Sequence, residues 1–215
     1  MGLPIIGLGA GGHAKVLIDL ILLTQEYEPI GLLDRDERLF NTEINGVPVL
    51  GPDSLLPSIR ESGVYHFFVG LGGTTDLIPR RKLFELAIGY EFQPVTLIHP
   101  SASVSPFSTL GSGTTLMVNS VVNANTQIGK NCIINSGAII EHDCTIGDHV
   151  HVATGATLCG GVTVGDETHI GAGAVVRQLI EIGRAATIGA GTVVIRNVIV
   201  GQVVVGNPAR PIRGR

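Results

Sequence analysis

The sequence has no tryptophan, only 4 % aromatic residues and only 15 % charged residues over its 215 positions. Soluble domains usually carry about 25 % charged residues, so this chain has a small charged surface, as expected when an oligomer buries part of its exterior. The shortage of charge, together with 44 % hydrophobic residues, excludes an intrinsically disordered chain. The 30 glycines follow no Gly-X-Y period, which excludes collagen.

Basic stripes, long apolar runs and cysteine pairs are also missing. The net charge of −4 argues against a general nucleic-acid-binding protein. No apolar run approaches about 20 residues, so we expect no membrane span. The amino-terminal residues lack the pattern of a secretion signal. The three cysteines form no C-x-x-C pair, which argues against a disulfide framework or a zinc knuckle, and we expect a cytoplasmic protein.

An aliphatic residue recurs at every sixth position through the second half of the chain. Ile, Val or Leu fills all eighteen positions of the series from Ile98 to Val200. A small or β-branched residue often follows four positions later, as at Cys132 and Cys144. A six-residue period is the signature of a parallel β-helix, in which both kinds of residue fill the interior of each coil. Three hexapeptides complete one coil, so residues eighteen apart should stack at about 4.8 Å. The sequence therefore predicts a β-helix domain over residues 96–215.

Residues 1–95 lack this period and alternate between strand and helix patterns. Apolar segments typical of strands end in glycine-rich turns, and helical patterns follow the turns. The expected strands span residues 3–8, 29–33 and 65–70, and the expected helices span residues 14–23 and 77–88. This alternation predicts a small Rossmann-like domain, with a parallel sheet of the β-α-β type.

The first glycine-rich turn, Gly9-Ala10-Gly11-Gly12-His13, places backbone N–H groups at the start of a helix, where they can hold a phosphate. Asp34, at the end of the second strand, could accept hydrogen bonds from a ribose or a base. With a second glycine turn at residues 70–73, these features favour nucleotide binding, although such turns are also compatible with a tight turn that binds nothing. The first turn lacks the third glycine of G-x-G-x-x-G, which argues against a dinucleotide.

Four motifs add a resemblance to a known family. They are G-A-G-G-H after the first strand, L-D-R-D after the second, I-E-H-D within the hexapeptide region and V-G-N-P-A-R near the carboxyl terminus. With these motifs the sequence resembles, over nearly its whole length, the sialic-acid O-acetyltransferase-like sugar acyltransferases, and most closely the bacillosamine and perosamine N-acetyltransferases. The resemblance implies a left-handed β-helix, a homotrimer with acetyl-CoA between neighbouring helices, a nucleotide-binding N-terminal domain and no metal.

The resemblance also implies roles for individual residues. It makes His142 the general base and Asp143 the carboxylate that raises the basicity of this histidine. The acetyl-CoA contacts of the family fall on His151, Gly160, Ala172 and Ala190. The substrate contacts fall on Gly11, Gly12, His13, Asp34, Arg35 and Gly72. Some relatives carry a second acid in place of Arg35, so the base of the nucleotide stays open.

The spacing of the histidines supports this chemistry. His142 lies two residues after the inward-facing Ile140, so its side chain should face outward. Gly160 lies eighteen residues later, so its N–H should lie about one coil above and could stabilise a thioester oxygen. His151 and His169 are also eighteen residues apart and should stack on each other. His142 and His151 should lie on different parts of the coil, so they can share a ligand only across a subunit boundary.

These features predict an acetyl-CoA-dependent N-acetyltransferase that acts on the amino group of a UDP- or GDP-linked 4-amino-4,6-dideoxy sugar, with neutral His142 taking the amine proton. O-acetylation of sialic acid or a related sugar is the alternative within the same class of enzyme. Seven histidines also leave open a zinc-dependent lyase of the γ-carbonic anhydrase type. The remaining alternative is a nucleotide-binding scaffold without activity, in which His142 is an ordinary surface residue.

Overall fold

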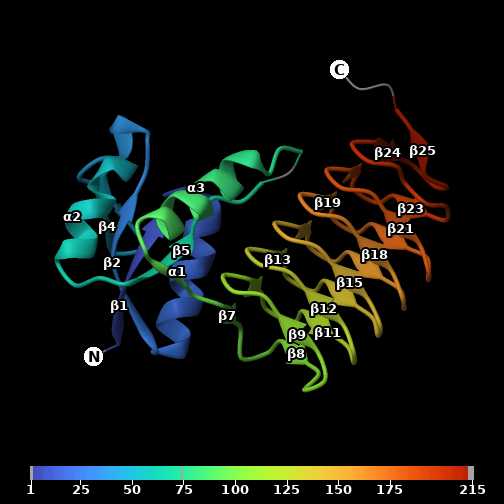
Figure 1. Ribbon diagram of the computed structural model, residues 1–215, viewed down its shortest axis with the longest axis horizontal. Helices are drawn as coiled ribbons and strands as arrows, with labels where there is room; N and C mark the ends of the chain where they lie inside the picture. The colour runs from blue at the N-terminus through green and yellow to red at the C-terminus, as the bar shows by residue number, and fades with distance from the viewer. Residues whose placement is uncertain (1, 74, 213–215) are drawn as a thin grey trace. The chain divides into compact units, whose positions relative to one another are not determined.

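The computed structural model describes residues 2–73 and 75–212, whose contacts divide the chain into two units. The first unit comprises Met1–Gly72 and Ile78–Leu97, and the second comprises Gly73–Leu77 and Ile98–Arg215. Figure 1 shows the helices of the first unit in blue to green and the stacked short strands of the second in green to red. By its contacts, the short segment Gly73–Leu77 belongs with the stacked strands, although it follows the second glycine turn in the sequence.

The first unit is a six-stranded sheet flanked by helices, with the strand order β3-β4-β2-β1-β5-β6. Its strands are β1 (Leu3–Leu8), β2 (Tyr27–Leu33), β3 (Glu43–Ile44), β4 (Val47–Gly51), β5 (His66–Val69) and β6 (Gln93–Pro94). Its α-helices are α1 (Gly12–Thr24), α2 (Leu56–Glu61) and α3 (Ile78–Gly89), with 3₁₀ turns at Glu37–Leu39 and Asp53–Leu55. Neighbouring strands run parallel except in the β3–β4 hairpin. The predicted Rossmann-like β-α-β fold is confirmed.

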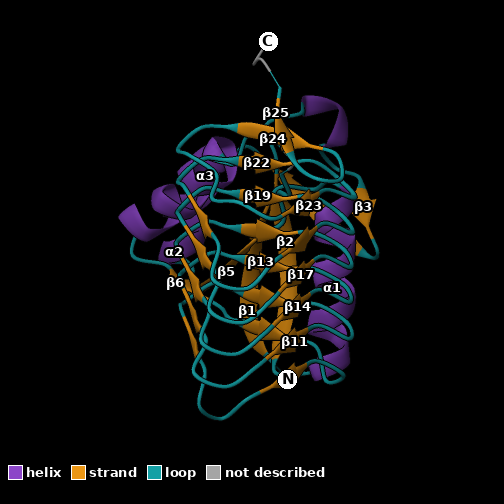
Figure 2. Cartoon of the chain, turned by 90° about the vertical axis from the view of Figure 1, so that its right-hand side faces the viewer, coloured by secondary structure: helices purple, strands orange, loops and turns teal. Residues whose placement is uncertain are grey.

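The sheet of the first unit is buried on both faces, which explains why its central strands are apolar throughout. On one face, Ile6 and Leu8 of β1 pack with Leu56 of α2 and Phe84 of α3. Figure 2 shows α1 on the other side of these strands from α2 and α3. The glycine turns after β1 and β5 therefore follow strands that are covered by helices on both faces of the sheet.

The hairpin β3–β4 and the helix α2 were not among the elements expected from the sequence. Both contain a proline, Pro48 and Pro57, and proline in a short apolar segment is typical of a loop. In α2 the proline lies in the first turn, where the missing N–H has no helical partner to lose.

The second unit is a left-handed parallel β-helix with three faces, which we call face 1, face 2 and face 3. Face 1 has the strand order β25-β24-β22-β19-β16-β13-β10-β7, face 2 the order β23-β20-β17-β14-β11-β8, and face 3 the order β21-β18-β15-β12-β9. Face 1 contains β7 (Leu97–Ile98), β10 (Thr115–Leu116), β13 (Ile133–Ile134), β16 (His151–Val152), β19 (His169–Ile170), β22 (Thr187–Ile188), β24 (Val203–Val205) and β25 (Arg210–Pro211). Face 2 contains β8 (Ser103–Val104), β11 (Val121–Val122), β14 (Ile139–Ile140), β17 (Thr157–Leu158), β20 (Val175–Val176) and β23 (Val193–Val194). Face 3 contains β9 (Thr109–Leu110), β12 (Gln127–Ile128), β15 (Thr145–Ile146), β18 (Thr163–Val164) and β21 (Glu181–Ile182).

The interior of the β-helix follows the six-residue period. Ile140 pairs with Leu158, eighteen residues on, and both side chains are fully buried. Cys132 and Cys144 are also fully buried, as predicted for the small interior positions. Ile98, in the first coil, is exposed because no earlier coil packs beneath it.

The last coil departs from this period, so the prediction for Val200 was wrong. Val200 is 70 % exposed, whereas Val198 and Val204 are buried. Ile182 bridges to Val198 and Ile188 pairs with Val204, in each case sixteen residues on instead of eighteen. The final turn is therefore two residues shorter than a regular coil, and this shift turns Val200 outward.

The residues after this short turn cover the end of the β-helix. The N–H of Val193 donates to the carbonyl of Gly206 (3.0 Å), and the N–H of Ala209 donates to the carbonyl of Val193 (2.8 Å). On face 1, β25 reverses direction and pairs antiparallel with β24. The last regular strands of face 1 and face 2 are thus bonded to later segments of the chain.

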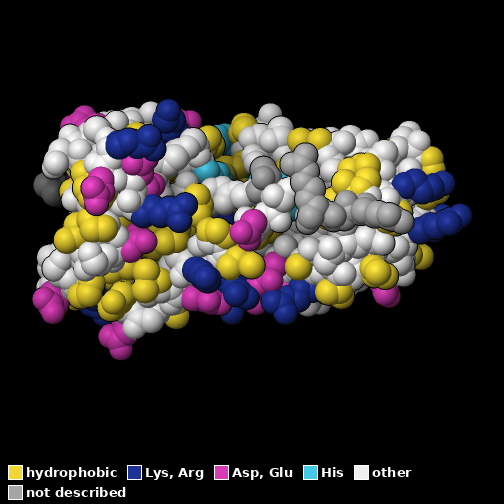
Figure 3. All heavy atoms as spheres, turned by 90° about the horizontal axis from the view of Figure 1, so that it is seen from above, with side chains coloured by type: hydrophobic (Ala, Val, Ile, Leu, Met, Phe, Trp, Pro, Cys, Tyr) yellow, Lys and Arg dark blue, Asp and Glu magenta, His cyan; other side chains and the backbone are white. Residues whose placement is uncertain are grey.

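Within residues 2–73 and 75–212, no helix is long and apolar enough to cross a membrane. These residues also contain no group of three or more His, Cys, Asp or Glu side chains placed to hold a metal ion. On the side of the molecule drawn in Figure 3, Lys and Arg side chains are interspersed with Asp and Glu.

Candidate active site

His142 and Asp143 lie at the corner between face 2 and face 3, directly after β14. The Nδ1–H of His142 donates to Oδ2 of Asp143 at 2.7 Å, since a carboxylate can only accept. Both side chains are more than half exposed. Asp143 has a left-handed backbone with φ of 59°, a conformation that Asp and Asn adopt more readily than most residues. The predicted pair is therefore present, with Nε2 of His142 left as the basic nitrogen.

The carboxylate of Asp143 is held by a second residue that the sequence analysis did not identify. Nδ2 of Asn125, one coil earlier, donates to Oδ1 of Asp143 at 3.2 Å. Hydrogen bonds from His142 and then Asn125 lower the pKa of Asp143 below its ordinary value. Asn125 is eighteen residues before Asp143, so the stacking period alone could have found it.

Gly160 lies one coil above His142, as the spacing predicted. A Cβ built on Gly160 would lie 2.7 Å from both Cε1 and Nε2 of His142, so the ring occupies the space that a side chain would need. The N–H of Gly161 donates to the carbonyl of His142 (2.9 Å), which fixes this stacking. Among the described residues, no backbone acceptor bonds the N–H of Gly160. This N–H is free to donate to a ligand.

An open hollow of about 480 Å³ surrounds this pair. Its lining consists of His142, Asp143, Cys159, Gly160, Gly161, Gln178 and Leu179. All seven belong to one corner and lie on three successive coils. Three of them were predicted as site residues, whereas Cys159, Gly161, Gln178 and Leu179 were not. The eighteen-residue period places Gln178 and Leu179 above Gly160 and Gly161.

His151 lies on face 1, in β16, and both of its ring nitrogens have partners within the chain. Its Nδ1–H donates to the carbonyl of Gly73 at 2.6 Å, and Nε2 accepts from Nδ2 of Asn135 at 3.1 Å. His151 and His169 stack edge to face with ring centroids 5.0 Å apart, as predicted. Burial, and then the nearby His151, lower the pKa of His169 from 6.5 to about 4, so the ring of His169 is neutral near pH 7.

Ala172 and Ala190 lie at a different corner from His142. Both follow strands of face 1, β19 and β22, and the N–H of Gly191 donates to the carbonyl of Ala172 (2.8 Å). Both alanines are exposed and stack one above the other. The structure thus brings the proposed cofactor residues Ala172 and Ala190 together, and Gly160 with His142, but it does not unite the two groups within one chain.

The substrate residues predicted in the first unit cluster at the ends of β1 and β2. Gly11 and Gly12 open α1, and a Cβ on either would meet no atom within 4 Å. Oδ2 of Asp34 accepts from the N–H of Ala10 (2.8 Å), which ties the first turn to the second strand. Asp34 also accepts from the N–H of Asp36 (3.0 Å). The turn thus leaves open space beside its N–H groups.

The second glycine turn packs closely on the first. A Cβ on Gly70 would collide with the carbonyl oxygen of Gly9, so glycine is required there for packing. Gly72 is looser, with the Cβ of His13 as its nearest neighbour at 3.5 Å. His13 and Gly72, both expected to contact substrate, are therefore neighbours.

Arg35 is exposed, as a residue that contacts a ligand should be. Asp53, which the sequence analysis missed, belongs to the same group of charges. Burial, and then the charge of Asp34, raise the pKa of Asp53, while Arg35 acts in the opposite direction. Asp53 lies 19 residues from Asp34 in a segment without a sequence motif, so nothing in the sequence pointed to it.

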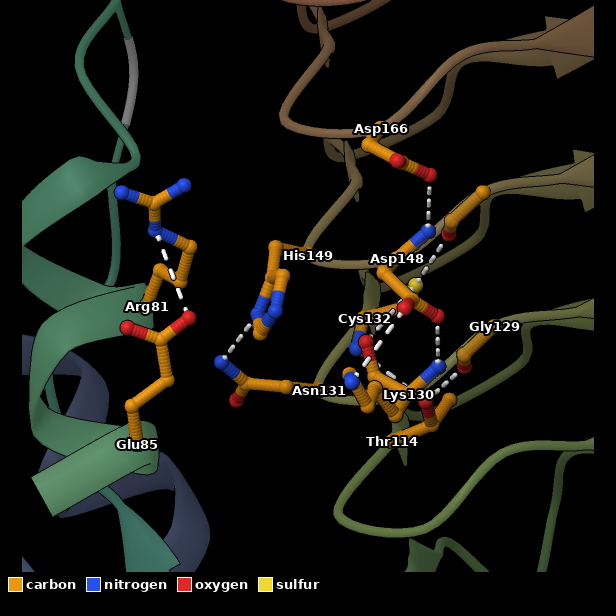
Figure 4. Close-up of polar contacts among 11 residues, drawn as sticks. Arg81, Glu85, Thr114, Gly129, Lys130, Asn131, Cys132, Asp148, His149 and Asp166 are labelled. Atoms are coloured by element: carbon orange, nitrogen blue, oxygen red, sulfur yellow. Dashed lines mark hydrogen bonds and ion pairs between the residues drawn. The ribbon is translucent and has the colours of Figure 1, made fainter.

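A second set of polar contacts lies at the corner between face 3 and face 1 (Figure 4). Nδ2 of Asn131 donates to Nδ1 of His149 at 2.9 Å, and Lys130 pairs with Asp148 through its ammonium at 3.5 Å. The N–H of Asp148 donates in turn to Asp166 at 2.8 Å. Each contact joins residues eighteen apart, so the cluster is explained by coil stacking.

Two family models match the sequence. The PglD N-terminal domain matches residues 4–86. The bacterial transferase hexapeptide (six repeats) matches residues 107–142, 125–160 and 143–178. The two matches fall on the two structural units.

The chain is also similar to named proteins. It is 32 % identical over 147 residues to a GDP-perosamine N-acetyltransferase of Escherichia coli O157:H7, a match that covers 66 % of this chain and 63 % of that relative. A mutant of GDP-perosamine N-acetyl transferase from Caulobacter crescentus, solved with CoA and GDP-perosamine, is 37 % identical over 100 % of this chain and 98 % of its own, with a TM-score of 0.91. The acetyltransferase domain of PglB from Neisseria gonorrhoeae, solved with acetyl coenzyme A, is 34 % identical over 99 % and 100 %, with a TM-score of 0.89.

Proposed function

The chain belongs to the bacterial hexapeptide acetyltransferases with a PglD N-terminal domain, and we propose that it transfers an acetyl group from acetyl-CoA to the amino group of a nucleotide-linked sugar. The observation that carries this proposal is the stacking of Gly160 on the hydrogen-bonded pair His142–Asp143. His142 and Gly160, whose N–H has no backbone acceptor among the described residues, line the same hollow. Acyl transfer from a thioester needs these two groups.

Each residue of the pair has a defined part in the reaction. Acetyl-CoA supplies the thioester, whose carbonyl carbon the sugar amine attacks. Nε2 of His142 accepts the proton that the amine loses as the C–N bond forms. Asp143 holds the other ring nitrogen and favours the imidazolium that results. The N–H of Gly160 donates to the carbonyl oxygen as its negative charge grows. His142 then returns the proton to the departing thiolate, so the products are an amide and free CoA.

The residues around the hollow fit a thioester. Because Gly160 has no side chain, the imidazole of His142 can lie close to its backbone, and both residues line the hollow. Ala172 and Ala190, two of the other residues expected to contact acetyl-CoA, lie at another corner of the β-helix, and the third, His151, lies on face 1. An extended CoA molecule would reach both groups if it lay between two chains. We therefore propose a cyclic homotrimer, with each site built from two subunits.

Sedimentation equilibrium tests this assembly. The expected mass is about three times 22.4 kDa. A stable monomer at assay concentration would contradict both the trimer and the shared site.

The first unit is proposed to hold the nucleotide. The open N–H groups at Gly11 and Gly12 lie at the start of α1, where a diphosphate is favoured. Oδ1 and Oδ2 of Asp34 each have one bond within the turn and retain lone pairs for a ribose or base. We favour a GDP-linked 4-amino-4,6-dideoxy sugar, since two of the three named relatives act on or bind GDP-perosamine. The UDP-linked sugar is the alternative.

A turnover assay tests the proposed function. The release of the CoA thiol is followed with acetyl-CoA and a panel of UDP-, GDP- and CMP-linked amino sugars, each with its hydroxyl analogue as the matched acceptor. We expect turnover with an amino sugar and none with the analogue. Turnover with hydroxyl acceptors alone would establish an O-acetyltransferase instead. The His142→Ala variant is the control for uncatalysed transfer.

A further inference from the structure

Leu179 has a backbone conformation that leucine rarely adopts. Its φ is 59°, in the left-handed region. The other non-glycine residues in this region are Gln25, Asn41, Asn45, Glu91, Asn119, Asn125, Asn131, Asp143, His149, Glu167 and Ala185. Leu179 is thus the one large apolar residue among the described residues with this conformation.

The fold itself gives no reason for a leucine at this position. The left-handed region brings Cβ close to the neighbouring carbonyl oxygen, which is why glycine, asparagine and aspartate usually occupy it. On the coils below, the equivalent positions hold Gly161, Asp143 and Asn125, as that rule predicts. Leu179 is 76 % exposed, so its side chain adds little to the core. Strained residues of this kind are concentrated at functional sites.

The side chain of Leu179 bounds the hollow that contains His142. The N–H of Leu179 donates to the carbonyl of Gly160 (3.1 Å), which stacks it one coil above the glycines. Its Cδ2 lies 2.7 Å from the position that a Cβ on Gly161 would take. The hollow therefore has the imidazole of His142 as its lower wall, two glycines behind it and an isobutyl group as its upper wall.

We propose that Leu179 sets the length of the acyl group that the enzyme accepts, an inference that rests on the proposed acyl transfer. The reacting carbonyl must lie within reach of Nε2 of His142 and of the N–H of Gly160. Gly160 and Gly161 lie on the single coil between His142 and Leu179, about 4.8 Å from the coil of each, and they carry no side chains. A methyl group fits beneath the isobutyl group of Leu179, whereas a longer acyl chain collides with it.

The test compares acyl-CoA thioesters of increasing length in the wild type and in Leu179→Gly. Dissociation constants for acetyl-, propionyl- and butyryl-CoA are measured by calorimetry without acceptor, and kcat/KM for the same donors is measured with the acceptor found in the turnover panel. In Leu179→Gly we expect the preference for acetyl-CoA over butyryl-CoA to fall by roughly tenfold or more, both in the dissociation constants and in kcat/KM. Discrimination of this size is usual when a pocket must accept or reject a few methylene groups. The Tm of Leu179→Gly should equal or exceed that of the wild type, because glycine relieves the left-handed strain.

Ala185→Gly is the matched control. Ala185 also has a left-handed backbone, with φ of 54°, but it lies at the corner between face 3 and face 1, away from the hollow. The Tm of Ala185→Gly should change in the same direction as that of Leu179→Gly. Its preference for acetyl-CoA over butyryl-CoA should equal that of the wild type. An equal loss of preference in both variants would overturn the proposal, because the effect would then be global.

The remaining outcomes separate the two proposals. If Leu179→Gly binds acetyl-CoA and prefers it over butyryl-CoA as strongly as the wild type does, Leu179 does not set the acyl length, but the proposed acetyl transfer is unaffected. If the wild type binds none of the three thioesters, both the proposed acetyl transfer and the role of Leu179 are wrong.

Discussion

The imidazole of His142 lies against the Cα of Gly160, so that a Cβ added to this glycine would be 2.7 Å from Nε2. The two residues are eighteen apart and stack because each coil repeats after three hexapeptides. The backbone of Gly160 is outside the left-handed region, so it could accommodate other residues. Glycine is needed at this position to leave space beside the histidine.

Gly160→Ala should lower kcat by roughly a hundredfold or more, because the new methyl group displaces the imidazole of His142, the proposed general base, from its place beside residue 160. Its Tm should stay close to that of the wild type, since Ala fits the backbone and His142 is exposed and can turn away. Steady-state kinetics and a thermal melt check both parts. Wild-type kcat in this variant would mean that the contact has no part in catalysis.

His142→Ala should lower kcat by about 10²–10⁴-fold, the usual contribution of a general base. KM for acetyl-CoA should change little, since the imidazole acts on the proton of the acceptor. The measurement is kcat from about pH 5.5 to 9 for both proteins. If the two profiles have the same shape and similar height, the amine loses its proton to water and His142 is not the base.

Asp143→Asn should be milder than His142→Ala, because it weakens the imidazolium without removing the base. The pKa of Asp143 is lowered, so its carboxylate stays ionised over the whole assay range and its support of His142 is lost only in stronger acid. Asn125→Ala removes one hydrogen bond to Asp143 but keeps its carboxylate. The pH at which kcat has fallen to half should therefore be the same in Asn125→Ala and in the wild type. A midpoint that moves with Asn125 would show that Asp143 itself titrates in this range.

Gly12→Val should raise KM for the nucleotide sugar by tenfold or more and leave KM for acetyl-CoA unchanged. A Cβ at Gly12 has open space around it, so the fold can accept valine while the ligand loses its approach to the backbone. Asp34→Ala should act in the same direction. Binding of the nucleotide sugar is measured by calorimetry, with Tm as the test of folding. Wild-type affinity in both variants would show that the turn binds nothing.

His151→Phe should raise KM for the nucleotide sugar more than KM for acetyl-CoA. Its two ring nitrogens bond Gly73 and Asn135, and Gly73 directly follows the turn that ends at Gly72. His151→Asn is the matched variant, since its side-chain amide can still donate to the carbonyl of Gly73, and it should recover part of the loss. A larger effect on acetyl-CoA would instead support the cofactor contact that the family resemblance implies.

His169 should make the folded protein less stable in acid. The unfolded chain binds a proton at the ordinary pKa of 6.5, whereas the folded chain does so only near 4, so stability falls as the pH decreases between these values. His169→Phe keeps a ring against His151 and removes the titrating group, so its Tm at pH 4.5 should exceed that of the wild type by roughly 5 °C. Thermal melts at pH 7 and 4.5 give the comparison. Parallel losses of Tm in both proteins would assign the acid sensitivity to other groups.

The sequence predicted the β-helix well because the interior of each coil takes an aliphatic residue at every sixth position. It could not predict the short final turn, since Val198, Val200 and Val204 are all valine and either register fills the interior. The stacking period placed Gly160 over His142 without any structure.

Other parts of the site follow no period. The bond from His151 to Gly73 joins residues 78 positions apart, and no motif links them. Leu179 keeps the stacking period, but it precedes the buried Ile180 in an apolar pair, so its left-handed backbone and its exposure were not evident from the sequence. Asp53 joins the charges around Asp34 through the packing of a segment that carries no motif. Contacts of these kinds form only when distant segments pack together in the folded chain. They cannot be predicted from a local pattern in one sequence.

The covered end of the β-helix has a consequence for assembly. A bare final coil would expose three rows of unpaired backbone groups, on which the coil of another molecule could grow. Here Gly206 and Ala209 already bond Val193, and face 1 ends in β25, where Pro211 has no N–H to offer a further strand. On faces 1 and 2 the chain therefore blocks the addition of a further coil at this end. Removal of the residues after 202 would turn the last coil into a template for fibre growth.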